Sequence, residues 1–304
     1  MSSFQTRQGS LKIVDAAKVA ARGSIFVAEA RLRTMMKWIW LIIGLAIANP
    51  VLYLVSIGLG VGAYIDKNTG GMGVDGVSYI TFLAPALLAT AAIQGAIDES
   101  VYPTLEGFKW NKIFFSMNST PLSGNHIATG VFLNSLIRVT FTAIIYWLVM
   151  LVFGVLESPR AWLAIFTAII YWFVMLAFGV LESPRAWLAI FTAVMAGAAF
   201  GALMQALAGM LENEDIFFTV LQRFVIMPLF LFSGTFYPLT NMPIYLQWIG
   251  WISPLWHATE LGRWLSYGHE ISTLMLYTHF IFLNSLLLIG IIASRRIFTR
   301  RLGK

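Results

Sequence analysis

Long apolar segments separated by short polar ones form the main pattern of this chain. Six predominantly apolar segments are each long enough to cross a bilayer as a helix. They run over about residues 38–64, 79–97, 126–156, 186–211, 216–236 and 271–294. The pattern therefore predicts an all-α, polytopic membrane protein with a transmembrane domain over 38–294.

The two ends of the chain are polar and basic. Residues 1–37 form an N-terminal segment in which 1–15 look disordered and Ala16–Met36 suits an interfacial helix of moderate amphipathicity. Residues 295–304 read as a basic tail. Seven of the 20 lysines and arginines lie in 1–37 and five in 295–304, so the positive-inside rule predicts that both ends are cytoplasmic.

The polar stretch 99–125 lies between the second and third apolar segments and cannot itself cross a bilayer. Its pattern predicts a short helix at about 104–118, bounded by Pro103 before it and by Pro121 and Gly124 after it. A helix so rich in aromatic residues at a membrane face needs a partner to cover it. The alternative is a membrane-surface helix without a partner.

Seven side chains of this helix are candidates for contact with a partner. They are Leu105, Glu106, Phe108, Lys109, Trp110, Lys112 and Phe114. Glu106 and Lys109 are spaced to pair with each other. Lys109 and Lys112 suit either acidic groups of a protein or anionic lipid headgroups. Trp110 and Phe114 are the stronger contact candidates, because aromatic residues anchor interfaces.

A near-identical tandem repeat interrupts the pattern. Residues 141–165 are followed at once by 166–190, and the copies differ only at Leu148/Phe173 and Val152/Ala177. This similarity indicates a recent duplication or an assembly error, since repeat architectures contain several divergent units. The repeat creates an additional apolar segment, Ala161–Leu181. Counting it gives seven spans and places the C-terminus outside. We favour six spans, with this segment re-entrant or lying on the surface.

Residues 237–264 contain three prolines, four tryptophans and apolar pieces too short to cross a bilayer. They predict re-entrant or interfacial helices at the external face. The tryptophans read first as an interfacial belt and second as a surface for cargo. Glu260 and Arg263 are three residues apart on a short helix and are expected to pair with each other.

Polar and small residues within the apolar segments indicate helix contacts. Gln94 and Gln205 are expected to hydrogen-bond between helices, and Arg138 needs a partner because an intramembrane charge is costly. Arg223 can reach the interface or pair with Glu212 or Asp215. Two small-xxx-small pairs predict close helix packing, and they are Gly58 with Gly62 and Gly197 with Gly201.

Composition supports an integral membrane protein. Of its 304 residues 59% are hydrophobic and 11% are charged, against about 25% charged in soluble domains. Mean hydropathy is +0.78. The net charge of +6 fits basic ends beside spans better than nucleic-acid binding. No signal peptide is evident, because the first apolar segment begins only at Trp38. There is no cysteine, which excludes disulfides.

The sequence also bears on catalytic alternatives. No GxxxxGK[ST] motif occurs, so ATP binding by a P-loop is excluded. The four histidines are scattered, and we expect no metal site. A hydrolase triad of a serine with His257 and Glu260 is conceivable but is explained less well than an external gate. A secondary transporter or a membrane-embedded transferase remains the rival class. The first should carry carboxylates at mid-membrane and the second a polar catalytic cluster.

Three stretches resemble the permease subunits of the ABC-2 transporter family, in the branch of daunorubicin-resistance and nodulation-factor exporters. They are KWNKIFFSMNSTPLSGNHIATG (109–130), AGAAFGALMQALAGMLENED (196–215) and LFLFSGTFYPLTNMPIYLQWIGWISPLWHATELGRW (229–264). The resemblance covers about residues 20–300, apart from one copy of the repeat. Removing a copy leaves the length usual for this branch. The duplication is the one departure, and it raises the alternative of an inactive or misassembled permease.

The resemblance implies a six-helix transmembrane domain of the type V ABC exporter kind, in the cell membrane. It implies a homodimer joined to two copies of a separate ABC ATPase, which would bind ATP and Mg²⁺ while this chain binds no cofactor. The helix at 104–118 would couple ATPase closure to spans 1, 2 and 5. Drugs, lipid-linked glycans or lipo-oligosaccharides would leave past an external gate. That gate would contain Phe236, Tyr237, Pro238, Pro254, His257, Glu260 and Arg263.

Overall fold

The structure is a computed structural model that describes residues 16–70, 73–152, 188–211 and 220–303. Within these ranges it is a bundle of α-helices with no β-strand, and five helices are long and apolar enough to cross a membrane. They cover Ile39–Asn68, Tyr79–Trp110, Gly124–Met150, Ala189–Met210 and Thr273–Leu302. The all-α, multi-pass prediction is confirmed.

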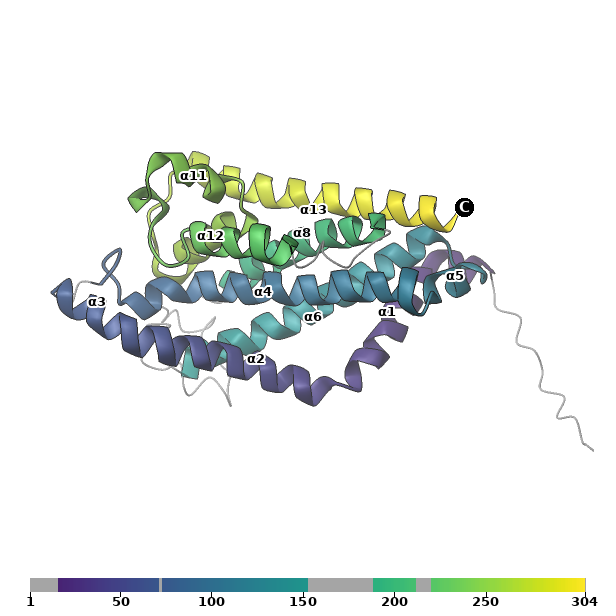
Figure 1. The fold of residues 1–304 in the computed structure, drawn as a ribbon, viewed down its shortest axis with the longest axis horizontal. Coiled ribbons are helices and arrows are strands. Elements are labelled where there is room, and N and C mark those ends of the chain that lie inside the picture. The colour runs from purple at the N-terminus through teal and green to yellow at the C-terminus, as the bar shows by residue number, and fades with distance from the viewer. Residues whose placement is uncertain (1–15, 71–72, 153–187, 212–219, 304) are drawn as a thin grey trace, which may run out of the picture.

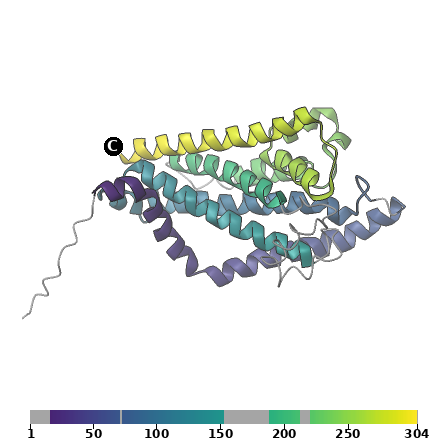
Figure 2. The ribbon, with the colours of Figure 1, turned by 180° about the vertical axis from the view of Figure 1, so that it is seen from behind.

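The helices lie lengthwise in an elongated bundle whose two ends differ (Figure 1). One end carries α1 (Ala16–Met36), α5 (Ile113–Asn118) and the C-terminus. The opposite end carries α3 (Ala63–Asn68) and α11 (Ile244–Trp251). The reverse view in Figure 2 shows the same separation. The segments predicted to be cytoplasmic and external therefore lie at opposite ends.

The first long helix consists of α2 (Ile39–Tyr53), the π-helical η1 (Leu54–Gly62) and α3. The others are α4 (Tyr79–Leu105), which continues as the π-helical η2 (Glu106–Trp110), then α6 (Gly124–Val152), α8 (Ala189–Met210) and α13 (Thr273–Leu302). Shorter elements follow α8, and they are η5 (Gln222–Ile226), α10 (Met227–Phe232), η6 (Leu239–Asn241), α11 and α12 (Pro254–Tyr267).

Two predicted features extend outside the described residues. The predicted span 216–236 is helical from Val220 to Phe232, and 216–219 lie outside the description. The beginning of the repeat belongs to α6 and its end to the start of α8. Ala161–Leu181 lies outside the described residues, so the six- and seven-span alternatives both stand, as does the interpretation of 1–15.

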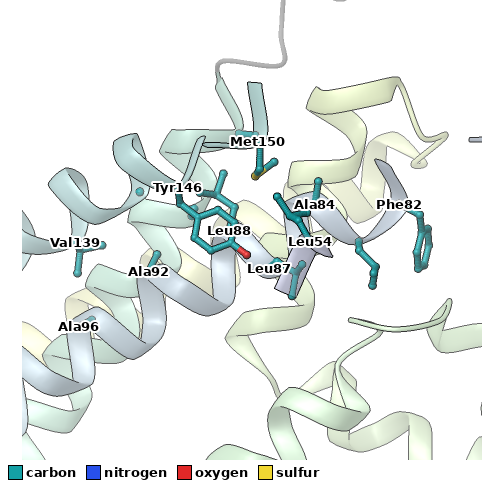
Figure 3. Packing of buried hydrophobic residues seen from close by; sticks show 14 of the residues in the cluster. Leu54, Phe82, Ala84, Leu87, Leu88, Ala92, Ala96, Val139, Tyr146 and Met150 are labelled. Atoms are coloured by element: carbon teal, nitrogen blue, oxygen red, sulfur yellow. The ribbon is translucent and has the colours of Figure 1, made fainter. Parts of the chain in front are cut away.

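Helix α4 is at the centre of the core. Its inward face packs against α6, α8 and η1 in a cluster of buried residues that includes Leu54, Phe82, Leu88, Val139 and Met150 (Figure 3). Small residues allow α4 and α8 to approach closely. A Cβ built on Gly197 would lie 2.7 Å from the carbonyl oxygen of Ala92. The predicted packing role of Gly197 and Gly201 is therefore confirmed.

The other small-residue pair, Gly58 with Gly62, shows no such close approach at Gly62. A Cβ on Gly62 would meet Tyr79 at 3.6 Å, an ordinary van der Waals contact. The surroundings of Gly58 lie outside the described residues. Helices α2 and α13 leave large apolar side chains exposed, among them Trp40, Leu52, Leu274 and Ile281. Such a surface suits lipid or another apolar partner.

Two element boundaries differ from the prediction, whereas the N-terminal helix Ala16–Met36 is confirmed. The helix of the second predicted span does not end near residue 97, because α4 and η2 form one continuous helix to Trp110. The basic segment 295–304 is not a free tail, because α13 continues to Leu302, where Phe298 and Leu302 are buried.

Candidate functional site

The polar stretch 99–125 folds back on itself at one end of the bundle. The long helix passes through Pro103 and ends at Trp110, Lys112 adopts a left-handed conformation with φ of 54°, and α5 follows. The prediction of one helix over 104–118 is therefore wrong. The reversal at Lys112 places α5 against the helix that precedes it, and Gly107 makes room. A Cβ there would lie 2.4 Å from the ring of Phe114.

A cluster of three phenylalanines, called here the aromatic cluster, joins this reversal to α13. The rings of Phe108 and Phe114 are 5.0 Å apart and edge-to-face, and Phe108 lies 4.8 Å from Phe298. All three rings are at most 3% exposed. Val27 of α1 and Ile127 of α6 pack against them. Five helices therefore meet at this cluster, namely α1, the continuous α4–η2 helix, α5, α6 and α13. Edge-to-face pairs stabilise such contacts beyond simple burial.

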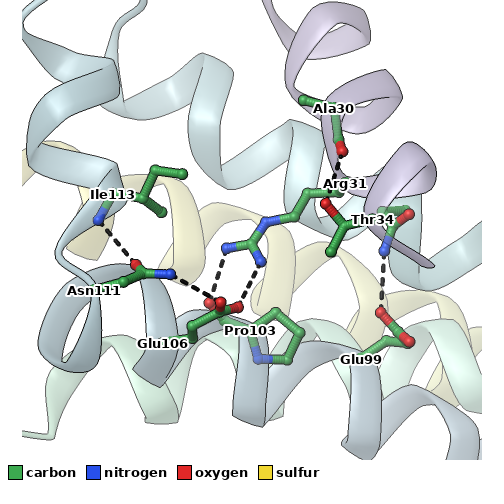
Figure 4. A network of polar contacts seen from close by, with 9 residues as sticks. Ala30, Arg31, Thr34, Glu99, Pro103, Glu106, Asn111 and Ile113 are labelled. Carbon is green, nitrogen blue, oxygen red and sulfur yellow. Dashed lines mark hydrogen bonds and ion pairs between the residues drawn. The ribbon is translucent and has the colours of Figure 1, made fainter. Parts of the chain in front are cut away.

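Polar contacts from α1 fix the same region (Figure 4). Arg31 donates to Glu106 and to the carbonyl oxygen of Pro103, both at 3.0 Å. Asn111 donates to the other carboxylate oxygen of Glu106 at 2.8 Å. Glu106, predicted to pair with Lys109, is thus bonded to α1 and to the turn that follows η2. Arg31 also lies 5.3 Å above the ring of Phe114.

The end of α13 contributes its own anchors. Arg301 donates to the carbonyl oxygens of Gly209 and Leu211, at 2.8 and 3.2 Å. Its guanidinium lies 4.4 Å above the ring of Phe108, a cation–π arrangement. Asn118 at the end of α5 donates to the carbonyl oxygen of Leu302 at 3.1 Å.

Exposure divides the predicted contact residues into two groups. Leu105, Phe108 and Phe114 are buried in the bundle, so the prediction that they face a partner is corrected. Trp110 is 56% exposed, and Ile113 and Phe115 are also exposed. Sequence reasoning did not select Ile113 or Phe115, because a continuous helix misplaces every residue after Lys112. Trp110, Lys112, Ile113 and Phe115 form what we call the exposed apical surface.

The residues predicted as an external gate lie at the other end. Arg263 is 1% exposed, pairs with Glu260 at 2.9 Å as predicted, and donates to the carbonyl oxygen of Gly234 at 2.6 Å. Its guanidinium lies 3.8 Å above the ring of Phe82 of α4. Arg263 therefore ties α12 to α4.

His269 extends this ion pair to the loop before α4. Its two ring nitrogens lie 3.4 Å from Glu260 and 3.3 Å from Asp75. The hydrogen bond to Glu260 is the main reason that the pKa of His269 lies above its usual value, and burial opposes it. In its protonated form His269 bridges the two carboxylates at this end.

The other predicted gate residues occupy several settings. Tyr79 donates to the carbonyl oxygen of Phe236 at 3.1 Å, Tyr237 is partly exposed, and Pro254 begins α12. Pro238 immediately precedes the short helix η6. The ring nitrogens of His257 lie 2.7 Å from His279 and 3.0 Å from the carbonyl oxygen of Trp251, so neither is paired with Glu260 as the considered hydrolase triad requires. Trp248 and Trp251 are exposed and suit an interfacial belt, whereas Trp256 is buried.

The predicted intramembrane polar residues mostly have structural partners. Arg138 of α6 lies 3.8 Å from Glu99 of α4. Gln205 donates to the carbonyl oxygen of Ala128 at 2.8 Å, which confirms an interhelical bond. Gln94 is a correction, because it donates to Asp98 of its own helix. Arg223 lines a cavity of about 340 Å³ between α4 and η5, whereas Glu212 and Asp215 lie outside the described residues.

Comparison with known proteins supplies the family. Residues 155–267, which contain α8 and α12, match the family model described as ABC-2 type transporter. Over this part of its length the chain is similar to the ABC-2 type transporter family. The chain is also 25% identical over 231 residues to nodulation protein J of Rhizobium leguminosarum bv. viciae, covering 76% of this chain and 77% of that protein.

Two further relatives agree. Nodulation protein J of Neorhizobium galegae is 25% identical, with 76% of each chain covered, and that of Rhizobium meliloti is 23% identical, with 74% of each covered. No solved structure matches the chain. The match and the membrane helices together identify the chain as a multi-pass membrane permease of an ABC exporter.

Proposed function

We propose that this permease is driven by a separate ABC ATPase that docks on the exposed apical surface. Two copies of the chain and two ATPase subunits would form the exporter. The chain itself supplies no P-loop, so ATP and Mg²⁺ would be held by the partner. The cargo would be hydrophobic or amphipathic, in keeping with the apolar faces that α2 and α13 expose.

The proposal rests on one observation: buried side chains directly beneath the exposed apical surface connect it to the long helices of the bundle. Phe114 lies in the same short helix as exposed Ile113 and Phe115, and it packs directly on Phe108 and Phe298. Arg31 ties α1 to the same turn through Glu106. Because the protein interior is close-packed, a displacement of this surface moves α1, α4, α6 and α13 together.

The charge distribution supports a cytoplasmic position for this end. Arg31, Arg33, Lys109, Lys112 and Arg301 all belong to elements gathered there. An excess of lysine and arginine marks cytoplasmic segments. The chain termini and the ATPase contact would accordingly lie inside, and α11 would lie at the external face.

A double substitution of exposed residues tests this proposal. Trp110→Ala with Phe115→Ala removes the two largest apolar side chains of the surface while leaving Phe114 in place. A single aromatic hot spot contributes about 2 kcal/mol or more, so we expect permease–ATPase affinity to fall by at least about thirtyfold in the double variant. ATPase stimulation in proteoliposomes should fall with it, whereas the thermal unfolding midpoint of the permease should fall only slightly, because both side chains are exposed.

The matched control places the same kind of change at the opposite end. Tyr245 and Trp248 of α11 are 71% and 53% exposed, so Tyr245→Ala with Trp248→Ala removes similar area without touching the proposed contact. This control should retain ATPase stimulation. Full stimulation by the Trp110/Phe115 double variant, or transport by the purified permease without any ATPase, would overturn the proposal.

A further inference from the structure

A basic pocket lies along the last turns of α13, beside the start of α6. It has a volume of about 490 Å³ and is lined by Asn125, Ile292, Arg295, Arg296, Thr299 and Arg300. Three guanidinium groups thus line one pocket and no carboxylate does. In the part of the chain that the structure describes, Arg296 and Arg300 form no ion pair.

The pocket is held in shape by neutral contacts. Arg295 donates through Nε to the Thr129 hydroxyl at 3.0 Å, which leaves both of its terminal nitrogens for an anion. Thr299 donates to the side-chain oxygen of Asn125 at 3.0 Å and so ties α13 to the start of α6. Guanidinium forks arranged in this way match the oxygens of a phosphate group.

An apolar groove adjoins the pocket at Arg295. This second cavity, of about 180 Å³, lies between α6, α8 and α13, and its lining includes Phe132, Leu133, Ile291 and Ser294. Arg295 lines both cavities. Ser294 is 3% exposed, and its hydroxyl has no hydrogen-bond partner among the described residues. A cation-lined pocket that shares Arg295 with an apolar groove fits a phosphate head with an acyl chain.

We propose that this pocket and groove bind one anionic glycerophospholipid of the cytoplasmic leaflet. Arg295, Arg296 and Arg300 hold its phosphate, Ser294 donates to an ester carbonyl oxygen, and an acyl chain lies along Phe132, Leu133 and Ile291. The lipid would fasten α13 to α6. The assignment of the leaflet rests on the orientation proposed above, but the site does not depend on coupling to an ATPase.

Native mass spectrometry of the purified full-length chain in detergent tests the site. Phosphatidylglycerol and phosphatidylcholine with the same acyl chains are the probes, and inorganic phosphate is the soluble competitor. Each basic residue near an anionic lipid contributes on the order of a fewfold in affinity. We therefore expect the triple variant Arg295→Gln, Arg296→Gln and Arg300→Gln to lose phosphatidylglycerol by at least about tenfold.

Two further variants separate the parts of the site. Arg33→Gln removes an exposed cation of α1 at the same end and should retain the lipid. Leu133→Trp fills the groove without changing charge and should also lower retention of phosphatidylglycerol. Equal retention of the two lipids, unchanged binding by the triple variant, or complete displacement by inorganic phosphate alone would overturn the proposal. None of these outcomes bears on ATPase docking.

Discussion

Phe114→Ala is the sharpest perturbation of the aromatic cluster. The ring is 0% exposed, lies 5.0 Å from Phe108 and 5.5 Å from Phe298, and sits over Gly107. Truncation of a buried phenylalanine costs about 3–5 kcal/mol, including the cavity left behind. We expect a cost of about 3 kcal/mol or more here, because the Arg31–Glu106 pair prevents the surrounding walls from collapsing into the cavity.

Hydrogen exchange on the purified full-length permease measures this cost locally. A loss of about 3 kcal/mol corresponds to roughly a hundredfold greater population of the open form. Some amides of 113–118 and of the last turn of α13 exchange with solvent only when this region opens locally. Their exchange should therefore accelerate about a hundredfold. Amides of α12, at the other end of the bundle, should keep their rates.

Phe115→Ala is the control, since the neighbouring Phe115 ring is 42% exposed and meets the aromatic cluster at its rim, 6.0 Å from the ring of Phe108. It should cost less than about 1 kcal/mol, which accelerates exchange less than about fivefold. Equal acceleration by the two variants would refute the reasoning, because it would mean that Phe114 is not packed in the cluster.

Two further perturbations test the bundle itself. Gly197→Val drives a side chain into the Ala92 carbonyl, so thermal unfolding of the purified protein should show a destabilisation of about 1–3 kcal/mol. Gly44→Val is the control, because a Cβ at Gly44 meets no atom within 4 Å, and it should leave the stability unchanged in the same assay. The pKa of His269 is higher in the folded protein than the value of about 6.5 in the unfolded chain. Its bond to Glu260 therefore contributes its full stabilisation below a pH of about 6.5, and this contribution is lost as the pH rises through the folded-state pKa. His269→Asn should remove that part of the pH dependence of unfolding, and an unchanged pH profile would contradict the assignment.

Apolar length and small-residue spacing predicted the bundle well. The helix Ala16–Met36 and the close contact at Gly197 follow from local pattern, because each depends on residues within one or two turns. The pairing of Glu260 with Arg263 follows from helical spacing in the same way. These features require no knowledge of where distant segments lie.

The candidate site was less predictable, because contacts between segments far apart in the sequence determine which of its side chains are buried. Phe114 and Phe115 are adjacent and identical, and burial distinguishes them only once Phe298 and the reversal at Lys112 are in place. A left-handed lysine has no strong sequence signal, since glycine, asparagine or aspartate is the usual residue there. Gly107 was the available clue, because a glycine next to a conspicuous aromatic run permits close approach of a ring.

The position of Phe298 also changes how force can pass through the molecule. A coupling helix attached only to span 2 would move that span first. Here Phe108 of η2, Phe114 of α5 and Phe298 of α13 share one cluster, and Arg31 adds α1. The last helix is thus connected to the exposed apical surface through direct side-chain packing of Phe298 on Phe108 and Phe114. A push on Trp110 or Phe115 therefore reaches the first and last helices of the described chain in one step.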